Sequence, residues 1–211
     1  MNGDDFLDTA RVSARLLRNP AVAGAWDEAS ALPGFSVAGL AGHLGYQVLA
    51  LQRILDTPAP TEPKISLLDH YARVEWIDAD LDADVNVRIR SGGEDVAADG
   101  PKALADSVDA AVTGLNESLS TVPSDRPVRL PLWGPWSLTI DDMLVTRMME
   151  LAVHADDLAV SVGVPTPRFS ESTVDTVLRL LTRLAARRHG PTAVMRSFSR
   201  AERAAKSIAA F

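Results

Sequence analysis

A helical repeat of apolar residues is the feature that most limits what this chain can fold into. Between residues 36 and 55, apolar side chains line up on one side of an α-helix with 3.6 residues per turn. They are Val37, Leu40, Ala41, Leu44, Val48, Leu51 and Leu55. This pattern predicts a long helix with one face in the core and Ser36 as its N-cap. Comparable patterns predict helices over residues 4–17, 66–78, 101–119, 139–162 and 170–189.

Only one segment alternates between polar and apolar residues as a strand would. It covers residues 84–90, Asp-Val-Asn-Val-Arg-Ile-Arg. An isolated strand is not stable, and no second alternating run is present to pair with it, so a helix is favoured here as well. The fold class is therefore all-α, a bundle of helices joined by short loops without paired strands.

Composition excludes several kinds of chemistry. The chain has 211 residues, 46% of them hydrophobic and 23% charged, as expected of a globular protein with one large domain. An acidic N-terminus and the lack of any run of 18 apolar residues predict a cytoplasmic protein with no membrane partner. Because the chain has no cysteine, its own residues cannot supply a thiolate nucleophile, a cysteine-ligated zinc ion or an iron–sulfur cluster.

A basic segment near the C-terminus raises the question of a nucleic-acid partner. Residues 179–206 hold eight Arg or Lys side chains and a single acid, Glu202. A solvated helix face with an Arg-rich tail explains this segment without any partner. No aromatic residue is interleaved with the arginines of residues 179–190, so nucleic-acid binding is not expected.

The predicted helix over residues 139–162 carries an unusual polar stripe. At about 100° per residue, four ionisable side chains fall on one narrow face: Arg147, Glu150, His154 and Asp157. Most of the remaining surface of this helix is apolar. Buried charges are costly unless they are paired or bind a metal, so the stripe predicts an inward-facing polar site.

Glu150 and His154 have the spacing of two metal ligands on one helical face. Separated by four residues, their side chains project side by side from successive turns. His43 is the candidate for a third ligand, because it lies beside the core stripe of residues 36–55. The small residues Gly39 and Gly42 nearby would let another helix approach. Two histidines and one carboxylate would leave coordination positions open for water and substrate.

Other interpretations of these residues stay open. The Glu150–His154 pair could be a simple salt bridge, and His43 could be a hydrogen-bonded packing residue. Asp157 could accept a hydrogen bond from the imidazole of His154 and so support the site together with Arg147, or the two could form an internal salt bridge. The two remaining histidines are expected to be structural, with His70 in a packed segment and His189 at a helix C-terminus.

Three segments together resemble a known family. They are residues 35–44 (FSVAGLAGHL), residues 147–158 (RMMELAVHADDL) and residues 163–165 (GVP). In this order they are similar to the mycothiol-dependent maleylpyruvate isomerase family of the DinB-like superfamily, and the resemblance covers about residues 5–165. It implies a DinB-like four-helix bundle over residues 1–165, with residues 166–211 as a helical extension packed on the same domain.

The resemblance also implies a metal and a cosubstrate. It assigns His43, Glu150 and His154 as ligands of a divalent metal, zinc first, with nickel, iron and manganese as alternatives. It also implies mycothiol, a low-molecular-weight thiol, as cosubstrate. Family members that act as isomerases carry a further α/β domain, whereas the residues after Gly163 here read as a helix and a tail.

These observations fit a metal-dependent thiol S-transferase or isomerase. The metal-bound thiolate of the cosubstrate would be the nucleophile, and an electrophilic small molecule the substrate. Trp133, Trp136 and Met143 could form walls of the substrate pocket, although ordinary loop packing explains the two tryptophans equally well. The alternative is a helical bundle that binds a metal or small molecule without turnover. The chain is expected to act as a monomer or a homodimer.

Overall fold

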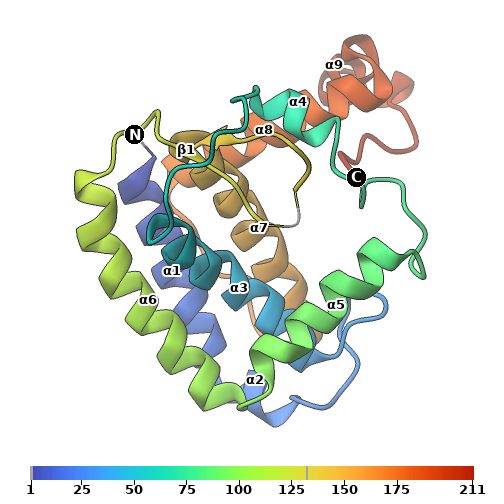
Figure 1. Cartoon of the computed structure of the whole chain (residues 1–211). Coiled ribbons are helices and arrows are strands. Elements are labelled where there is room, and N and C mark those ends of the chain that lie inside the picture. Colours follow the sequence, from blue (N-terminus) through green and yellow to red (C-terminus); the bar gives the residue numbers. More distant parts are fainter. Residues whose placement is uncertain (1, 132) are drawn as a thin grey trace.

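The computed structural model describes residues 2–131 and 133–211. Four long helices form a bundle: α1 (Gly3–Leu17), α3 (Val37–Leu55), α6 (Pro101–Thr121) and α7 (Ile140–Ser161) (Figure 1). Their apolar faces meet in one continuous core, in which Leu44, Leu115 and Leu144 are fully buried. The predicted all-α bundle is confirmed, and the helix predicted from Ser36 to Leu55 lies at its centre.

The other helices lie around the bundle. They are α2 (Pro20–Gly24), α4 (Leu67–Tyr71), α5 (Asp84–Ala97), α8 (Glu171–His189), α9 (Pro191–Ser199) and the 3₁₀ helix η1 (Ala201–Arg203). Figure 1 shows α4, α8 and α9 gathered at one end of the bundle and α2 at the other. Helix α8 packs on α1 and α7, and a buried hydrogen bond of 2.9 Å joins the hydroxyls of Thr9 and Thr173.

Three helices begin directly after a Ser or Thr whose side chain caps the helix N-terminus. The side chains of Ser36, Thr139 and Ser170 each accept a hydrogen bond from the backbone N–H three residues later. These bonds satisfy amide groups that have no partner within the helix. The cap at Thr139 sets the start of α7 and therefore the position of every later residue in its polar stripe.

The segment over residues 84–90 is helical, as favoured from its sequence, and forms the first half of α5. This helix crosses α3 at very close range. A Cβ atom added at Gly42 would lie 2.0 Å from the carbonyl oxygen of Gly93, and one added at Gly93 would lie 2.3 Å from that of Gly39. The small residues beside His43 therefore do admit a neighbouring helix, which covers the part of α3 that carries this histidine.

Two predictions were wrong. The helix expected over residues 66–78 ends at Tyr71, and the chain then turns so that the ring of Trp76 packs 4.8 Å from that of Phe211. Paired strands also exist, since β1 (Pro127–Val128) and β2 (Leu138–Thr139) form an antiparallel pair. With two residues each, these strands are too short for an alternating pattern to reveal them.

None of the helices formed by residues 2–131 and 133–211 is long and apolar enough to cross a membrane.

Candidate metal centre

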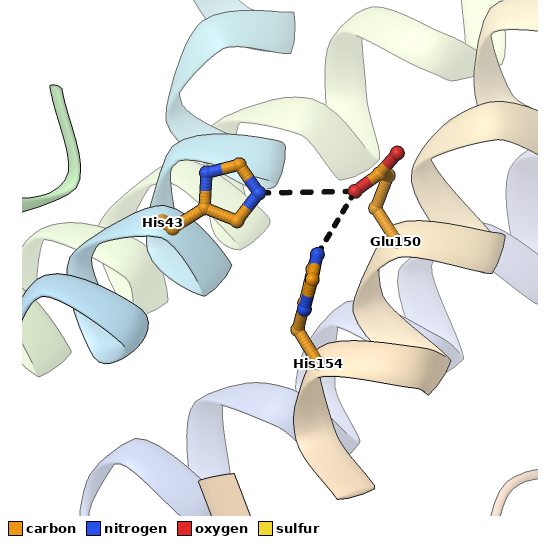
Figure 2. A group of neighbouring side chains, drawn as sticks. All are labelled: His43, Glu150 and His154. Atoms are coloured by element: carbon orange, nitrogen blue, oxygen red, sulfur yellow. Dashed lines mark hydrogen bonds and ion pairs between the residues drawn. The ribbon is translucent and has the colours of Figure 1, made fainter. Parts of the chain in front are cut away.

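Three side chains from two helices converge between α3 and α7 (Figure 2). The Oε2 atom of Glu150 lies 3.2 Å from Nε2 of His154 and 3.8 Å from Nε2 of His43. One ligand atom from each residue lies within 4.8 Å of the other two. The rings of His43 and His154 meet edge to face with their centroids 4.8 Å apart. The structure thus brings together the three residues that the sequence singled out as candidate ligands.

The polar stripe of α7 faces inward because the rest of the helix is needed for the core. Met148, Met149 and Leu151 are buried on its other sides. The side chains of His43, Glu150 and His154 keep 15–17% of their surface exposed, so the cluster is mostly desolvated but reachable from solvent. Burying ionisable side chains in this way raises the free energy of the folded state unless they are paired with one another or with a cation.

The donor set fits a divalent metal ion. Zinc binds imidazole nitrogen and carboxylate oxygen at about 2.0–2.2 Å, which places neighbouring ligands of a tetrahedron about 3.3 Å apart. The separations from Glu150 to the two histidines, 3.2 Å and 3.8 Å, bracket this value. Three protein ligands leave at least one position for an exogenous group, the arrangement of catalytic rather than structural zinc sites.

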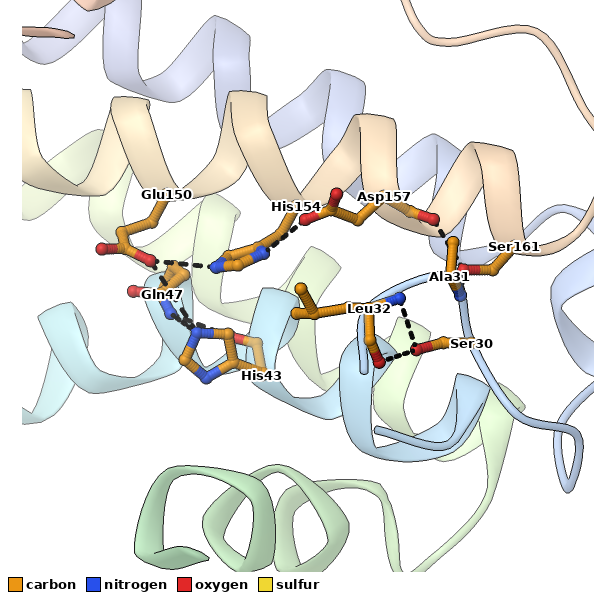
Figure 3. Close-up of polar contacts among 9 residues, drawn as sticks. All are labelled: Ser30, Ala31, Leu32, His43, Gln47, Glu150, His154, Asp157 and Ser161. Atoms are coloured by element: carbon orange, nitrogen blue, oxygen red, sulfur yellow. Dashed lines mark hydrogen bonds and ion pairs between the residues drawn. The ribbon is translucent and has the colours of Figure 1, made fainter. Parts of the chain in front are cut away.

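Asp157 fixes the orientation of His154 and is itself linked to the loop at Ala31 (Figure 3). Oδ2 of Asp157 lies 3.0 Å from Nδ1 of His154. When this carboxylate accepts the Nδ1 proton, the Nε2 atom of His154 is turned toward Glu150 and His43. The backbone oxygen of Asp157 accepts a hydrogen bond from Ser161, whose hydroxyl accepts one from the amide of Ala31. Of the two roles open to Asp157, contact with the imidazole is the one observed.

Gln47 holds His43 and was not identified from the sequence. It is 1% exposed, and its amide nitrogen lies 3.3 Å from Nε2 and 3.0 Å from the backbone oxygen of His43. Its amide oxygen accepts a hydrogen bond from the buried guanidinium of Arg147. Arg147 therefore links α7 to α3 through Gln47 and does not pair with Asp157 in an internal salt bridge. The sequence did contain a signal for Gln47: it is a lone polar residue on a buried helix face, one turn after His43.

Charges in the cluster depend on one another. Burial alone raises the pKa of Glu150, but the close imidazoles of His154 and His43 and the nearby Arg147 charge outweigh it, so the pKa lies well below its usual range. Burial alone lowers the pKa of His154, but Asp157 and Glu150 raise it to about 9. Burial lowers the pKa of His43. At neutral pH the cluster thus combines an anionic carboxylate with one protonated imidazole, His154, and one neutral imidazole, His43.

The remaining candidate residues lie elsewhere. Met143 is fully buried among core side chains and exposes no surface to a pocket. Trp133 and Trp136 both contact His70. The ring of Trp133 lies 4.3 Å from the imidazole ring, and the indole N–H of Trp136 donates to Nδ1 of His70 over 3.1 Å.

His189 ends α8, as expected, and its Nε2 lies 2.8 Å from the backbone oxygen of Ala209.

Part of the basic segment serves internal contacts. Arg187 donates to the backbone oxygen of Leu68 over 2.8 Å, which fastens α8 to α4. Arg188 forms an ion pair with Asp78. Two arginines of the basic segment therefore hold the C-terminal extension against the rest of the chain.

Comparisons with known proteins agree with this geometry. A solved structure described as the mycothiol-dependent maleylpyruvate isomerase superposes with a TM-score of 0.51 at 16% identity, covering 88% of this chain and 70% of the other. At that identity the likeness shows the shared fold. A search among curated proteins finds no match. The profile of the mycothiol maleylpyruvate isomerase N-terminal domain matches residues 6–159, which include all three converging side chains. The chain therefore belongs to the family of the mycothiol maleylpyruvate isomerase N-terminal domain.

Proposed function

We propose that this protein is a metal-dependent thiol S-transferase or isomerase that uses mycothiol and acts on an electrophilic small molecule. The convergence of His43, Glu150 and His154 carries the proposal, since these residues make a three-ligand site with room for an exogenous ligand. Membership of a family named for mycothiol supports the choice of thiol. The chain has no cysteine, so a sulfur nucleophile has to come from a cosubstrate.

His43, Glu150 and His154 would hold the metal ion, with zinc as the first choice for this donor set. Bound there, a divalent cation would lower the pKa of a coordinated thiol and supply a thiolate at neutral pH. Glu150 is the one anionic ligand, so the site would keep a positive charge that favours an anionic sulfur.

The neighbouring residues have distinct tasks in this proposal. Asp157 accepts the Nδ1 proton of His154 and keeps its Nε2 available. Gln47 and Arg147 fix His43 from the other side and add a buried positive charge beside the site. The α5 helix, which crosses α3 at Gly42, limits access of water to His43.

The test is an assay of mycothiol transfer. Zinc-loaded protein is incubated with mycothiol and a panel of electrophiles, and loss of free thiol and formation of conjugate or isomer are followed. We expect acceleration of at least one reaction, and its loss in His154→Ala. His189→Ala is the matched control, because it removes the same side chain far from the cluster. If no reaction depends on His154, the proposal is wrong; thiol binding without turnover would indicate a binding protein instead.

A further inference from the structure

A loop ahead of α3 is closed by its own hydrogen bonds. It covers residues 30–35 (the 30–35 loop), and the N–H of Phe35 donates to the backbone oxygen of Leu32 over 3.1 Å within a turn. Gly34 has a φ of 82° in this turn, which a type II turn requires at its third residue and which glycine adopts without strain. The N–H of Ser30 donates to the backbone oxygen of Phe35 over 2.9 Å. Because the loop is closed in this way, a contact at one end fixes the position of the other.

Ser161, the last residue of α7, fastens this loop to the helix that carries Glu150 and His154. Its hydroxyl donates to the backbone oxygen of Asp157 over 2.6 Å and accepts the N–H of Ala31 over 2.9 Å (Figure 3). A hydroxyl can donate and accept at a single atom, so this one side chain joins the loop to the helical turn that follows His154. The same turn carries the Asp157 carboxylate that contacts the His154 ring.

The other end of the loop contacts the second histidine of the cluster. The ring of Phe35 lies 5.8 Å from that of His43, and the two ring planes are tilted by 56°. Aromatic rings at this separation attract one another, and each then limits the rotation of the other. Figure 3 shows the side chain of Leu32 extending from the loop toward His43 and His154. The loop therefore contacts His43 directly and is attached through Ser161 to the helix that carries His154.

An imidazole that is oriented in advance favours metal binding. His43 and His154 come from different helices, and an ion between them needs the Nε2 atoms of both rings turned toward it. A ring that rotates freely loses this freedom when the metal binds, and the lost entropy weakens the affinity. Gln47 restrains His43 from within α3, through contacts with its Nε2 and its backbone oxygen. The ring of Phe35 adds a restraint from a different segment of the chain.

We propose that Ser161 is a positioning residue of the candidate metal centre. By fastening the 30–35 loop to α7, its hydroxyl keeps the ring of Phe35 against His43 and so orients this imidazole for metal binding. The part of this role that concerns the metal rests on the proposed function. The link from Ser161 through the loop to His43 rests on the contacts described above and exists without a metal ion.

The first experiment follows the ring of His43 by NMR in metal-free protein. Its Cε1–H signal is assigned with His43→Gln, and Phe35→Leu gives the shift that the Phe35 ring imposes on it. We expect Ser161→Ala to move the signal in the same direction as Phe35→Leu, because the released loop no longer holds the ring in place. Ser161→Thr keeps a hydroxyl and should restore the wild-type position. An unchanged His43 signal in Ser161→Ala would overturn the proposal.

Ser118→Ala is the matched control for this measurement. Ser118 donates to the backbone oxygen of Gly114, four residues earlier on α6, over 3.1 Å, so the variant loses the same kind of helical hydrogen bond. It should leave the His43 signal in place. A shift as large as that of Ser161→Ala would show that the signal reports a general loosening of the helices, and it would refute the specific link.

The second experiment measures zinc affinity by competition with a chromophoric chelator. Ser161→Ala should weaken binding about two- to tenfold, the range that one hydrogen bond sets, and Phe35→Leu should have an effect in the same range. Because both act through the same loop, the double variant should bind no more weakly than the weaker single variant. Losses that multiply in the double variant would contradict a shared path through Phe35.

The two experiments separate this inference from the proposed function. Wild-type protein that binds no zinc would refute the metal centre and the proposed function, while the His43 signal still decides whether Ser161 fixes this ring. Equally tight zinc binding in wild type and Ser161→Ala would refute the positioning role alone and leave the metal centre standing.

Discussion

The Oδ2 atom of Asp157 lies 3.0 Å from the Nδ1 atom of His154, one helical turn earlier on α7. Glu150 approaches the other nitrogen of the same ring at 3.2 Å. The imidazole is therefore held from both sides, with one nitrogen committed to Asp157 and the other turned toward the cluster. Contacts of this kind orient a metal-binding histidine and raise its affinity for the ion.

Removal of Asp157 should weaken metal binding without removing a ligand. We expect Asp157→Ala to lower zinc affinity about 10–100-fold, the usual effect of losing such a partner. Competition with a chromophoric chelator measures this affinity. Asp156→Ala is the matched control, because Asp156 is exposed and bonds to Thr166 instead. Equal affinities of the two variants would show that Asp157 does not support the site.

Metal content tests the ligand assignment directly. Untagged wild-type protein should carry close to one divalent ion per chain, and Glu150→Ala should lose most of it, because the only anionic member of the cluster is gone. Elemental analysis of both proteins, together with the surface variant Glu117→Ala, gives the comparison. The assignment fails if wild type and Glu150→Ala contain the same substoichiometric amount.

Acid should destabilise the fold through His70. Its pKa is 6.5 in an unfolded chain and about 4 in the folded protein, where burial disfavours the charged ring. A lowered pKa contributes stability that is present above pH 6.5 and is lost as pH falls toward 4. The full shift corresponds to about 3 kcal/mol of unfolding free energy. Urea denaturation of wild type and His70→Gln at several pH values should show a smaller loss in the variant, whereas parallel curves would contradict this account.

The crossing of α3 and α5 should tolerate no side chain at Gly42. An alanine there would place its Cβ 2.0 Å from the carbonyl oxygen of Gly93, so the two helices must move apart. We expect Gly42→Ala to reduce the free energy of unfolding by about 1–3 kcal/mol or more. Gly92→Ala is the control, because a Cβ at that position meets nothing within 4 Å. It should stabilise α5 by about 0.5–1 kcal/mol, the helix propensity difference. Denaturant midpoints of the two variants check both values.

Much of the bundle could be predicted from local patterns. The long helices, the cap at Ser36 and the helical state of residues 84–90 were all predicted correctly. The two-residue strands and the early end of α4 could not be predicted, because both depend on contacts with distant parts of the chain. Met143, on the same stripe as Glu150 and His154, is fully buried, because the start of α7 packs into the core.

The sequence by itself determined that Glu150 and His154 stand side by side, because helix geometry relates residues four positions apart wherever the helix lies. It also determined that their face of α7 is enclosed, since the apolar majority of that helix requires burial. Only the tertiary structure decided that His43 meets them, that Gln47 contacts His43 while accepting a hydrogen bond from Arg147, and that His70 accepts one from Trp136. These contacts join segments far apart in the chain, and packing of the whole core sets their geometry, which no local periodicity encodes.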